Sequence, residues 1–262
     1  MKIQNRTFII SGGASGLGKS SALELIQAGG HVAILDLSDP EAGQAVEQEL
    51  GPSARFFHCN VLDTESIARA VRGAAEWAST TGKPLGGVIP AAGVNLPAAI
   101  LNGKGQPVDL DDVDFVLGVN IRGTIDLIRQ SAVHLAKVEP EGPDGERGVV
   151  IMVSSSSAFD GQYGQVVYAA TKGAVASMAL PMARDLARHG IRVVAIAPNL
   201  FVTGMTSVMS EKVWKSISQT FLFPNRAGSP PEFSMLVKHI IENPMLNGTV
   251  IRLDGGSRLA KM

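Results

Sequence analysis

The chain has 262 residues, of which 45% are hydrophobic and 18% charged, and its formal net charge at pH 7 is −1. This balance argues against the basic surface of a nucleic-acid-binding protein. Cys59 is the only cysteine and excludes an intrachain disulfide, which fits a reducing compartment. The N-terminus reaches a glycine turn too soon for a signal peptide, and no apolar run has the length of a membrane span. We therefore expect a cytoplasmic protein with neither a nucleic-acid nor a membrane partner.

Strands and helices are predicted to alternate along the chain. Apolar runs bounded by turn residues predict strands over 6–13, 31–37, 54–61, 85–93, 148–156, 192–199 and 249–256. Helical spacing of apolar residues predicts helices over 19–30, 40–51, 63–82 and 111–138, and another around Tyr168. Because the strands are apolar throughout, we predict an α/β fold, a Rossmann-type doubly wound, mostly parallel seven-stranded sheet with helices on both faces. Residues 1–262 are expected to form one domain, with a cofactor half up to about residue 150 and a catalytic half after it.

A glycine-rich loop, "SGGASGLG", joins the first strand to the first helix. Gly12, Gly16 and Gly18 permit a tight turn and a close approach of the backbone to a ligand. The helix start behind them suits a pyrophosphate. The spacing is G-x-x-x-G-x-G rather than the commoner G-x-G-x-x-G. Ordinary turn chemistry would also explain these glycines, but their place between a strand and a helix favours dinucleotide binding.

Asp36 ends the second predicted strand, where a carboxylate can accept hydrogen bonds from an adenosine ribose. The same charge would repel a 2′-phosphate, and no Arg or Lys stands at Ser15 or just after Asp36 to bind one. We therefore predict NAD rather than NADP as the cofactor. The alternative is that Asp36 caps the next helix.

Tyr168 and Lys172 stand about one helical turn apart in a helix of small and apolar residues. Ser155 lies at the end of the fifth predicted strand, at the sheet edge where ligands bind in doubly wound folds. The ammonium of Lys172 would lower the pKa of the Tyr168 phenol, and Ser155 would hold the substrate oxygen. Tyr168 would then take a proton from an alcohol as hydride leaves its carbon. A core tyrosine beside a snorkelling lysine is the alternative, but it does not explain the pairing.

These motifs, together with Asn120 in "VNIRG", resemble the short-chain dehydrogenase/reductase family over the whole chain. The resemblance implies that Asn120, Ser155, Tyr168 and Lys172 are the catalytic residues. It also implies that Asn120 holds a water that links Lys172 to solvent.

Segments such as "FDGQYGQVVYAATKG" and "IIENPMLNGTVIRLDG" further resemble the short-chain 3-hydroxyacyl-CoA dehydrogenases of that family. This implies an NAD-dependent enzyme of fatty acid metabolism and a homotetramer. Ser155, Gln162, Gln165 and Tyr168 are the predicted substrate-binding residues. The predicted cofactor site comprises Gly12, Ser15, Gly16, Leu17, Gly18, Asp36, Asn60, Val61, Ala91, Gly93, Tyr168, Lys172, Pro198, Phe201 and Thr203.

Three positions depart from the family pattern. Asn60 replaces the usual Asp, although its carbonyl oxygen can still accept from an adenine amino group. Pro90 replaces an Asn that steadies the central strands, and it also removes a backbone donor, so local stability there must be achieved differently. Asn199 replaces a Gly after Pro198 and tolerates unusual backbone angles better than most residues.

Other features leave alternatives open. The five histidines show no metal-ligand spacing, so no metal is expected. Met205, Met209 and Trp214 lie where the family places a substrate lid and either contact an acyl chain or simply pack. Lys104, in the long loop 95–110, either meets a CoA phosphate or is an ordinary solvated lysine. A dehydrogenase of a steroid or other hydrophobic alcohol, or a non-catalytic dinucleotide-binding scaffold, are the competing functions.

Overall fold

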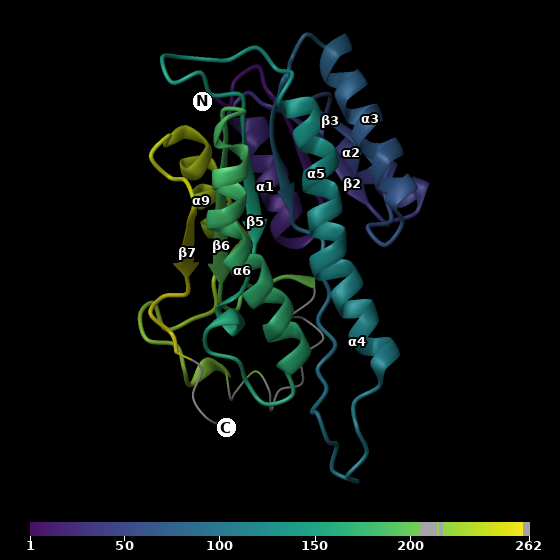
Figure 1. The fold of residues 1–262 in the computed structure, drawn as a ribbon, viewed down its shortest axis with the longest axis vertical. Coiled ribbons are helices and arrows are strands. Elements are labelled where there is room, and N and C mark those ends of the chain that lie inside the picture. Colours follow the sequence, from purple (N-terminus) through teal and green to yellow (C-terminus); the bar gives the residue numbers. More distant parts are fainter. Residues whose placement is uncertain (205–213, 215–216, 259–262) are drawn as a thin grey trace.

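The structure, a computed structural model, describes residues 1–204, 214 and 217–258. Its centre is a seven-stranded sheet in the order β3-β2-β1-β4-β5-β6-β7 (Figure 1). Every strand pair in it is parallel, so the predicted "mostly parallel" sheet is parallel throughout. The strand order reverses between β1 and β4. That reversal places the ligand crevice of a doubly wound sheet at the carboxyl ends of these two strands.

The predicted strands are confirmed in number and order. They end one to three residues earlier than predicted, and the sixth also begins one residue earlier. The strands are β1 (Thr7–Ser11), β2 (His31–Asp36), β3 (Ala54–His58), β4 (Leu85–Pro90), β5 (Gly148–Val153), β6 (Ile191–Pro198) and β7 (Thr249–Leu253). The helices are α1 (Gly16–Gln27), α2 (Pro40–Leu50), α3 (Thr64–Thr80), α4 (Leu110–Leu117), α5 (Thr124–Leu135), α6 (Val166–Ala187) and α9 (Pro230–Glu242). Two short elements complete the set, the π-helical turn η1 (Gly118–Gly123) and the 3₁₀ turn η2 (Ser156–Ala158).

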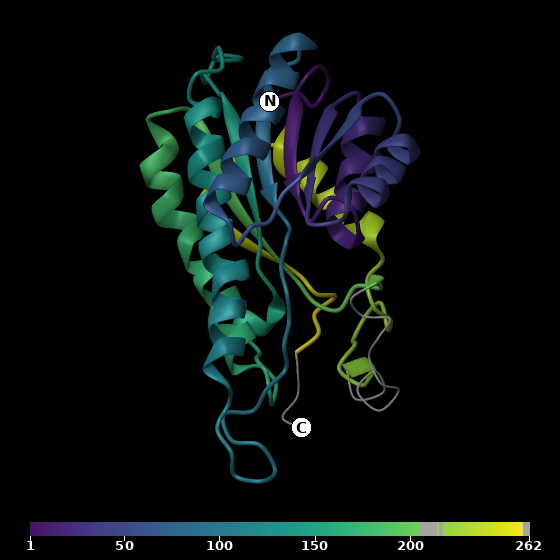
Figure 2. The same ribbon diagram turned by 90° about the vertical axis from the view of Figure 1, so that its right-hand side faces the viewer.

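Helices cover both faces of the sheet (Figure 2). A separate apolar core is buried on each face. On one face, α3, α5 and α6 contribute Val71, Leu127 and Val175. On the other, α1 and α9 contribute Leu25 and Phe233. Because β1, β2, β5 and β6 lie between these two layers, their side chains are buried on both sides, which explains the continuously apolar strand sequences.

Two parts of the helical prediction are corrected. The single helix expected over 111–138 is three elements, α4, η1 and α5, because the chain passes through a π-helical turn at Gly118–Gly123. The bounds of α9 were also not predicted, although the start of this helix is well marked in the sequence. Ser229 and Glu232 form a capping box there, and Pro230 occupies the first turn.

Pro90 ends β4 and pairs with Ser11 of β1. On its other side, the pairing of β4 with β5 covers only Gly87 and Val88, so the ladder there stops before the proline. Beyond Pro90 the chain is held by Ser11, whose carbonyl accepts from Ala91 N–H and whose hydroxyl accepts from Ala92 N–H. The missing donor is therefore accommodated where β4 no longer pairs with β5.

The expectation that no segment is long and apolar enough to cross a membrane is wrong for α6. Its 22 residues reach a mean hydropathy of 1.2 over an 18-residue window. One such helix is weak evidence of a span, because core helices meet the same criterion, and α6 packs along β5 and β6. Only 28% of that window is buried within the chain.

Candidate active site

The glycine loop between β1 and α1 forms a cradle made of backbone. Gly12 and Gly16 have φ of 64° and 51°, a region that suits glycine. A Cβ on Gly18 would lie 2.2 Å from the Gly12 carbonyl oxygen, and one on Gly12 would lie 2.9 Å from the Ala92 nitrogen. The loop therefore closes tightly on itself and on the chain after β4. The residues present fit a dinucleotide pyrophosphate, because α1 starts here with an exposed Ser15 whose side chain does not cap it.

Asp36 lies beside this cradle at the end of β2. One carboxylate oxygen accepts from Ala14 N–H at 3.1 Å, and the other accepts from the backbone and hydroxyl of Ser38 at 3.0 and 2.9 Å. Asp36 does not cap α2, since Asp39 does so by accepting from Ala42 N–H. The capping alternative is therefore wrong, and the carboxylate is oriented at the rim of the cradle.

Other predicted cofactor residues surround the same crevice. Asn60 forms a local turn, in which its side-chain oxygen accepts from Leu62 N–H at 3.0 Å. Val61 packs under Gly123, where a Cβ would lie only 2.8 Å from the Val61 carbonyl. Leu17 and Ala91 are half-buried against the core that includes β1.

The segment after β6 reaches the glycine loop from the catalytic half. Pro198 ends β6 opposite Leu253, and the Thr203 side chain lies 3.6 Å from where a Gly16 Cβ would be. Phe201 instead turns its ring into the core, at 6.2 Å from the Phe233 ring and edge-on to it. Its side chain is thus a packing group, and a cofactor contact there would have to involve its backbone.

Tyr168 lies in the first turn of α6, near Ser155, which stands two residues beyond β5. Burial raises the pKa of the Tyr168 phenol above its usual value, and the nearby Ser155 hydroxyl opposes this by lowering it. The expected lowering of this pKa by Lys172 is therefore not the controlling effect. The Lys172 nitrogen stands 5.7 Å from the centroid of the tyrosine ring.

Lys172 is almost fully buried, and its ammonium donates to the Val153 carbonyl at 2.9 Å. Its backbone carbonyl accepts from the Ser154 hydroxyl at 2.7 Å, which ties α6 to the end of β5. Burial lowers the pKa of Lys172 to about 8. The side chain therefore still carries its charge at neutral pH, but only narrowly. This is not a snorkelling lysine.

Asn120 lies in the π-helical turn and clamps three segments together. Its side-chain oxygen accepts from Val94 N–H at 2.9 Å, and its amide donates to the Val94 carbonyl at 2.9 Å and to the Thr171 hydroxyl at 3.1 Å. A Cβ on Gly93 would fall between Asn120 and Lys172, at 3.3 and 3.4 Å from their polar atoms. π-Helical turns are frequent at functional sites, and here the turn places Asn120 beside α6.

Thr171 is a residue that the sequence analysis missed. It is fully buried, and its hydroxyl accepts from Asn120 while donating to the Tyr168 carbonyl at 2.8 Å. Its position next to Lys172 in "YAATK" was the available signal, but a threonine in a helix has no distinctive pattern of its own. Only the tertiary fold brings Asn120 against it.

The two glutamines predicted to bind substrate lie in the loop that precedes α6. Gln165 accepts from the Ser157 hydroxyl at 3.1 Å, so its side chain stabilises that loop. Gln162 is half-buried nearby. Ala98 pairs with Gln165 and joins this loop to the hairpin formed by residues 95–109, which projects beyond the sheet (Figures 1 and 2).

The predicted lid lies mostly outside the described residues. Nothing is described for Met205 and Met209, and Trp214 is exposed at 36%. Asn199 does not use a left-handed backbone conformation, which among the described non-glycine residues occurs at Asn5. Its side chain instead accepts from the Ser156 hydroxyl at 3.1 Å.

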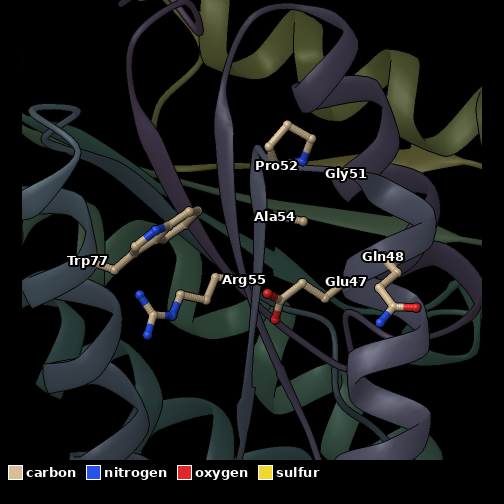
Figure 3. Close-up of a pocket in the computed structure, with 7 residues that line it drawn as sticks. All are labelled: Glu47, Gln48, Gly51, Pro52, Ala54, Arg55 and Trp77. Carbon is tan, nitrogen blue, oxygen red and sulfur yellow. The ribbon is translucent and has the colours of Figure 1, made fainter.

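A separate hollow of about 500 Å³ lies beside the edge strand β3, where this strand meets α2 and α3 (Figure 3). It contains none of the predicted site residues, and its lining residues are Glu47, Gln48, Gly51, Pro52, Ala54, Arg55 and Trp77. The predicted catalytic residues and the glycine loop lie instead at the carboxyl ends of the strands. Within the described part of the chain, no group of His, Cys, Asp or Glu side chains is arranged to hold a metal ion.

A dinucleotide cradle and a Ser–Tyr–Lys cluster at the same carboxyl end of a parallel sheet define an oxidoreductase acting on a CH–OH group with a nicotinamide dinucleotide. The comparisons agree, since the short chain dehydrogenase family model matches residues 6–214. This chain belongs to the short-chain dehydrogenase family.

Similar proteins cover nearly the whole chain. Human 3-hydroxyacyl-CoA dehydrogenase type-2 is 41% identical over 96% of this chain and 94% of its own length. The Drosophila melanogaster protein of the same name is 39% identical over 98% of this chain and 99% of its own. The crystal structure of 3-hydroxyacyl-CoA dehydrogenase type-2 from Mycobacterium avium has a TM-score of 0.90 and 32% identity, with 98% of both chains covered.

Proposed function

We propose that this chain is an NAD-dependent dehydrogenase of 3-hydroxyacyl-CoA esters in which Tyr168 is the acid–base residue. The observation that carries the proposal is the placement of Ser155 after β5 and of Tyr168 in the first turn of α6, with the Lys172 nitrogen 5.7 Å from the Tyr168 ring, at the end of the sheet where the glycine cradle also lies. When bound, NAD supplies the hydride acceptor. Ser155 holds the substrate oxygen, and Tyr168 takes the hydroxyl proton during oxidation or returns it during reduction.

The charge of Lys172 supports Tyr168 in this role. Lys172 stays protonated at neutral pH although its pKa falls to about 8, because that value is still above 7. A positive charge close to the phenol favours the phenolate that forms as the proton is transferred. The anchor to the Val153 carbonyl holds the ammonium in place. Asn120 fixes Val94 and Thr171 around it.

The two tyrosines of the chain provide a matched test of the acid–base assignment. Tyr163 lies in the loop before α6 and is 76% exposed, whereas Tyr168 lies in the first turn of α6 beside Lys172. We expect Tyr168→Phe to lower kcat for alcohol oxidation by about 10²–10⁴-fold, the range for loss of acid–base catalysis. Tyr163→Phe should keep kcat within about twofold. Equal activity of the two variants, measured as NADH absorbance, would refute the role of Tyr168.

The substrate class rests on the relatives and on one exposed lysine. Lys104 lies at the tip of the projecting hairpin, where its backbone joins a tight turn with Asn102 and its side chain is exposed. An acyl-CoA must leave its nucleotide end outside a catalytic cleft, and a cation there suits a CoA phosphate. We expect 3-hydroxybutyryl-CoA to be preferred over a 17β-hydroxysteroid in kcat/KM, and Lys104→Ala to weaken the CoA ester alone. A preference for the steroid would refute the acyl-CoA assignment and leave the dehydrogenase chemistry intact.

We further propose that the protein is a homotetramer. Apolar side chains stand exposed along α4, α5 and α6, among them Phe115, Ile125, Val133 and Leu180. Such a surface over adjoining helices is typical of an interface. Every residue of β7 is half-buried, as expected for an edge strand close to another subunit. A monomer in light scattering at micromolar concentration would contradict this proposal.

A further inference from the structure

Arg252, near the end of β7, joins the loop between β5 and α6 to the turn that follows β7. Its guanidinium donates to the carboxylate of Asp160, which lies in the loop between Ser155 and Tyr168. It also donates to Asp254 at 2.6 Å. One planar guanidinium thus holds two carboxylates from opposite ends of the catalytic half. Asp160 is 92 residues away from Arg252 in the sequence.

Packing reinforces this ion-pair cluster. The Arg252 guanidinium carbon lies 5.2 Å from the centroid of the Phe159 ring, within the range of a cation–π contact. The Asp160 and Arg252 side chains are 20% and 24% exposed, and that of Asp254 only 8%. These groups are therefore partly shielded from water, and their geometry is more constrained than that of an ordinary surface pair.

The turn after β7 is itself well ordered by Asp254. Its carboxylate accepts from Gly256 N–H at 3.0 Å and from Arg258 at 3.0 Å. Ser257 in this turn shares a hydrogen bond of 2.9 Å with Thr220, which lies between β6 and α9. Arg252 consequently couples the loop that carries Ser155 to a rigid support on β7.

We infer that Arg252 and Asp160 are positioning residues, which fix the loop between β5 and α6 so that Ser155 and Tyr168 keep their catalytic geometry. Removal of Arg252 would leave the Asp160 and Asp254 carboxylates facing each other, and their repulsion would push this loop away from β7. Small displacements of a catalytic group are costly, because about 1 Å of misplacement can lower a rate by as much as 10²-fold. This inference rests on the proposed roles of Ser155 and Tyr168.

The test compares this ion pair with an arginine–glutamate pair at the other end of the sheet. Arg192 donates to Glu146 at 2.7 Å, and both side chains are buried near the amino ends of β5 and β6. We would measure the melting temperature, the Kd for NAD, kcat and the deuterium isotope effect on 3-hydroxybutyryl-CoA oxidation. The variants are Asp160→Asn, Arg252→Gln, their double variant, Arg252→Lys and Glu146→Gln.

We expect Asp160→Asn and Arg252→Gln each to lower kcat about tenfold and to raise the isotope effect, with the Kd for NAD unchanged. The double variant should be no worse than either single one, because both remove the same contact. Arg252→Lys keeps the charge and should recover part of kcat. Glu146→Gln should lower the melting temperature without changing kcat or the isotope effect.

Two results would overturn the inference while Tyr168→Phe still abolishes activity. The first is an unchanged kcat per folded molecule in Asp160→Asn and Arg252→Gln. A decrease in kcat that Glu146→Gln shows to the same extent would count equally. The second is strict additivity in the double variant, which would mean that the two side chains act separately. If the wild-type protein oxidises no alcohol, or if Tyr168→Phe remains active, the proposed function itself fails instead.

Discussion

The glycine loop of the cofactor half is built from backbone, whereas the cluster around Lys172 in the catalytic half is built from buried polar side chains. In the first region, close contacts such as that of Gly18 with the Gly12 carbonyl exist because side chains are absent. In the second, Asn120, Thr171 and Lys172 are buried, and each is satisfied by hydrogen bonds. We therefore expect substitutions in the first region to act through steric overlap, and those in the second to act through loss of charge or hydrogen bonding.

The largest effect should come from Lys172→Met, which removes the charge and keeps most of the volume. We expect kcat to fall at least about 100-fold, because Tyr168 loses the nearby positive charge that favours its phenolate. Stability should change in the opposite direction. The pKa of Lys172 falls from 10.5 to about 8 on folding, so below pH 8 the folded protein bears the cost of a buried charge.

This stability gain has a defined pH window. Between pH 8 and 10.5 the folded protein releases the Lys172 proton before the unfolded chain does, and the cost disappears as pH rises. Lys172→Met should therefore raise the free energy of unfolding by about 1–3 kcal/mol at pH 7, with the advantage lost near pH 10.5. Urea unfolding of both proteins at pH 7 and at pH 10.5 measures this difference in the free energy of unfolding. A variant that is destabilised equally at both would show that the hydrogen bond to Val153 outweighs desolvation.

Ser155→Ala tests the influence of the Ser155 hydroxyl on Tyr168. This hydroxyl lowers the Tyr168 pKa against the effect of burial, so its removal should raise that pKa further. We expect kcat for alcohol oxidation to fall roughly tenfold or more, and the pH at which the rate is half-maximal to move upward. Ser157→Ala, two residues on, provides the control, although it also releases Gln165. An unchanged pH profile in Ser155→Ala would remove Ser155 from control of the phenol.

The two regions also differ in how far the sequence predicted them. The fold followed from the alternation of apolar strands with helices, and the cradle from glycine spacing, since both patterns are local. Tyr168 and Lys172 were paired because they are one turn apart. The π-helical turn at Asn120 was missed because the apolar spacing runs through it without a break. The contacts of Asn120 with Val94 and Thr171 depend on segments brought together only by the sheet.

Gly18→Ala tests the steric basis of the cradle. The added Cβ would lie 2.2 Å from the Gly12 carbonyl, and that backbone atom cannot move aside without opening the loop. We expect a loss of about 1–3 kcal/mol in the free energy of unfolding, with weaker NAD binding. Gly103→Ala is the matched control, because nothing lies within 4 Å of its added Cβ. Thermal unfolding of both variants, and NAD titration by fluorescence, measure the difference. Equal stability would mean that the cradle is more adaptable than its geometry implies.

The smallest effect should be a change in cofactor preference through Asp36, the charged side chain that we assign to the rim of the backbone-built cradle. Asp36 accepts from Ala14 and Ser38, and Leu37 beside it is 62% exposed and apolar. We expect wild-type protein to prefer NAD, because the carboxylate would repel a 2′-phosphate. Asp36→Ala combined with Leu37→Arg should shift the ratio of kcat/KM for NAD and NADP toward NADP by roughly tenfold, or about 1.4 kcal/mol. Leu37→Arg alone should shift it less, since Asp36 would pair with the new cation. If wild-type protein already uses NADP as well as NAD, the assignment of Asp36 is wrong, while the steric account of the cradle is unaffected.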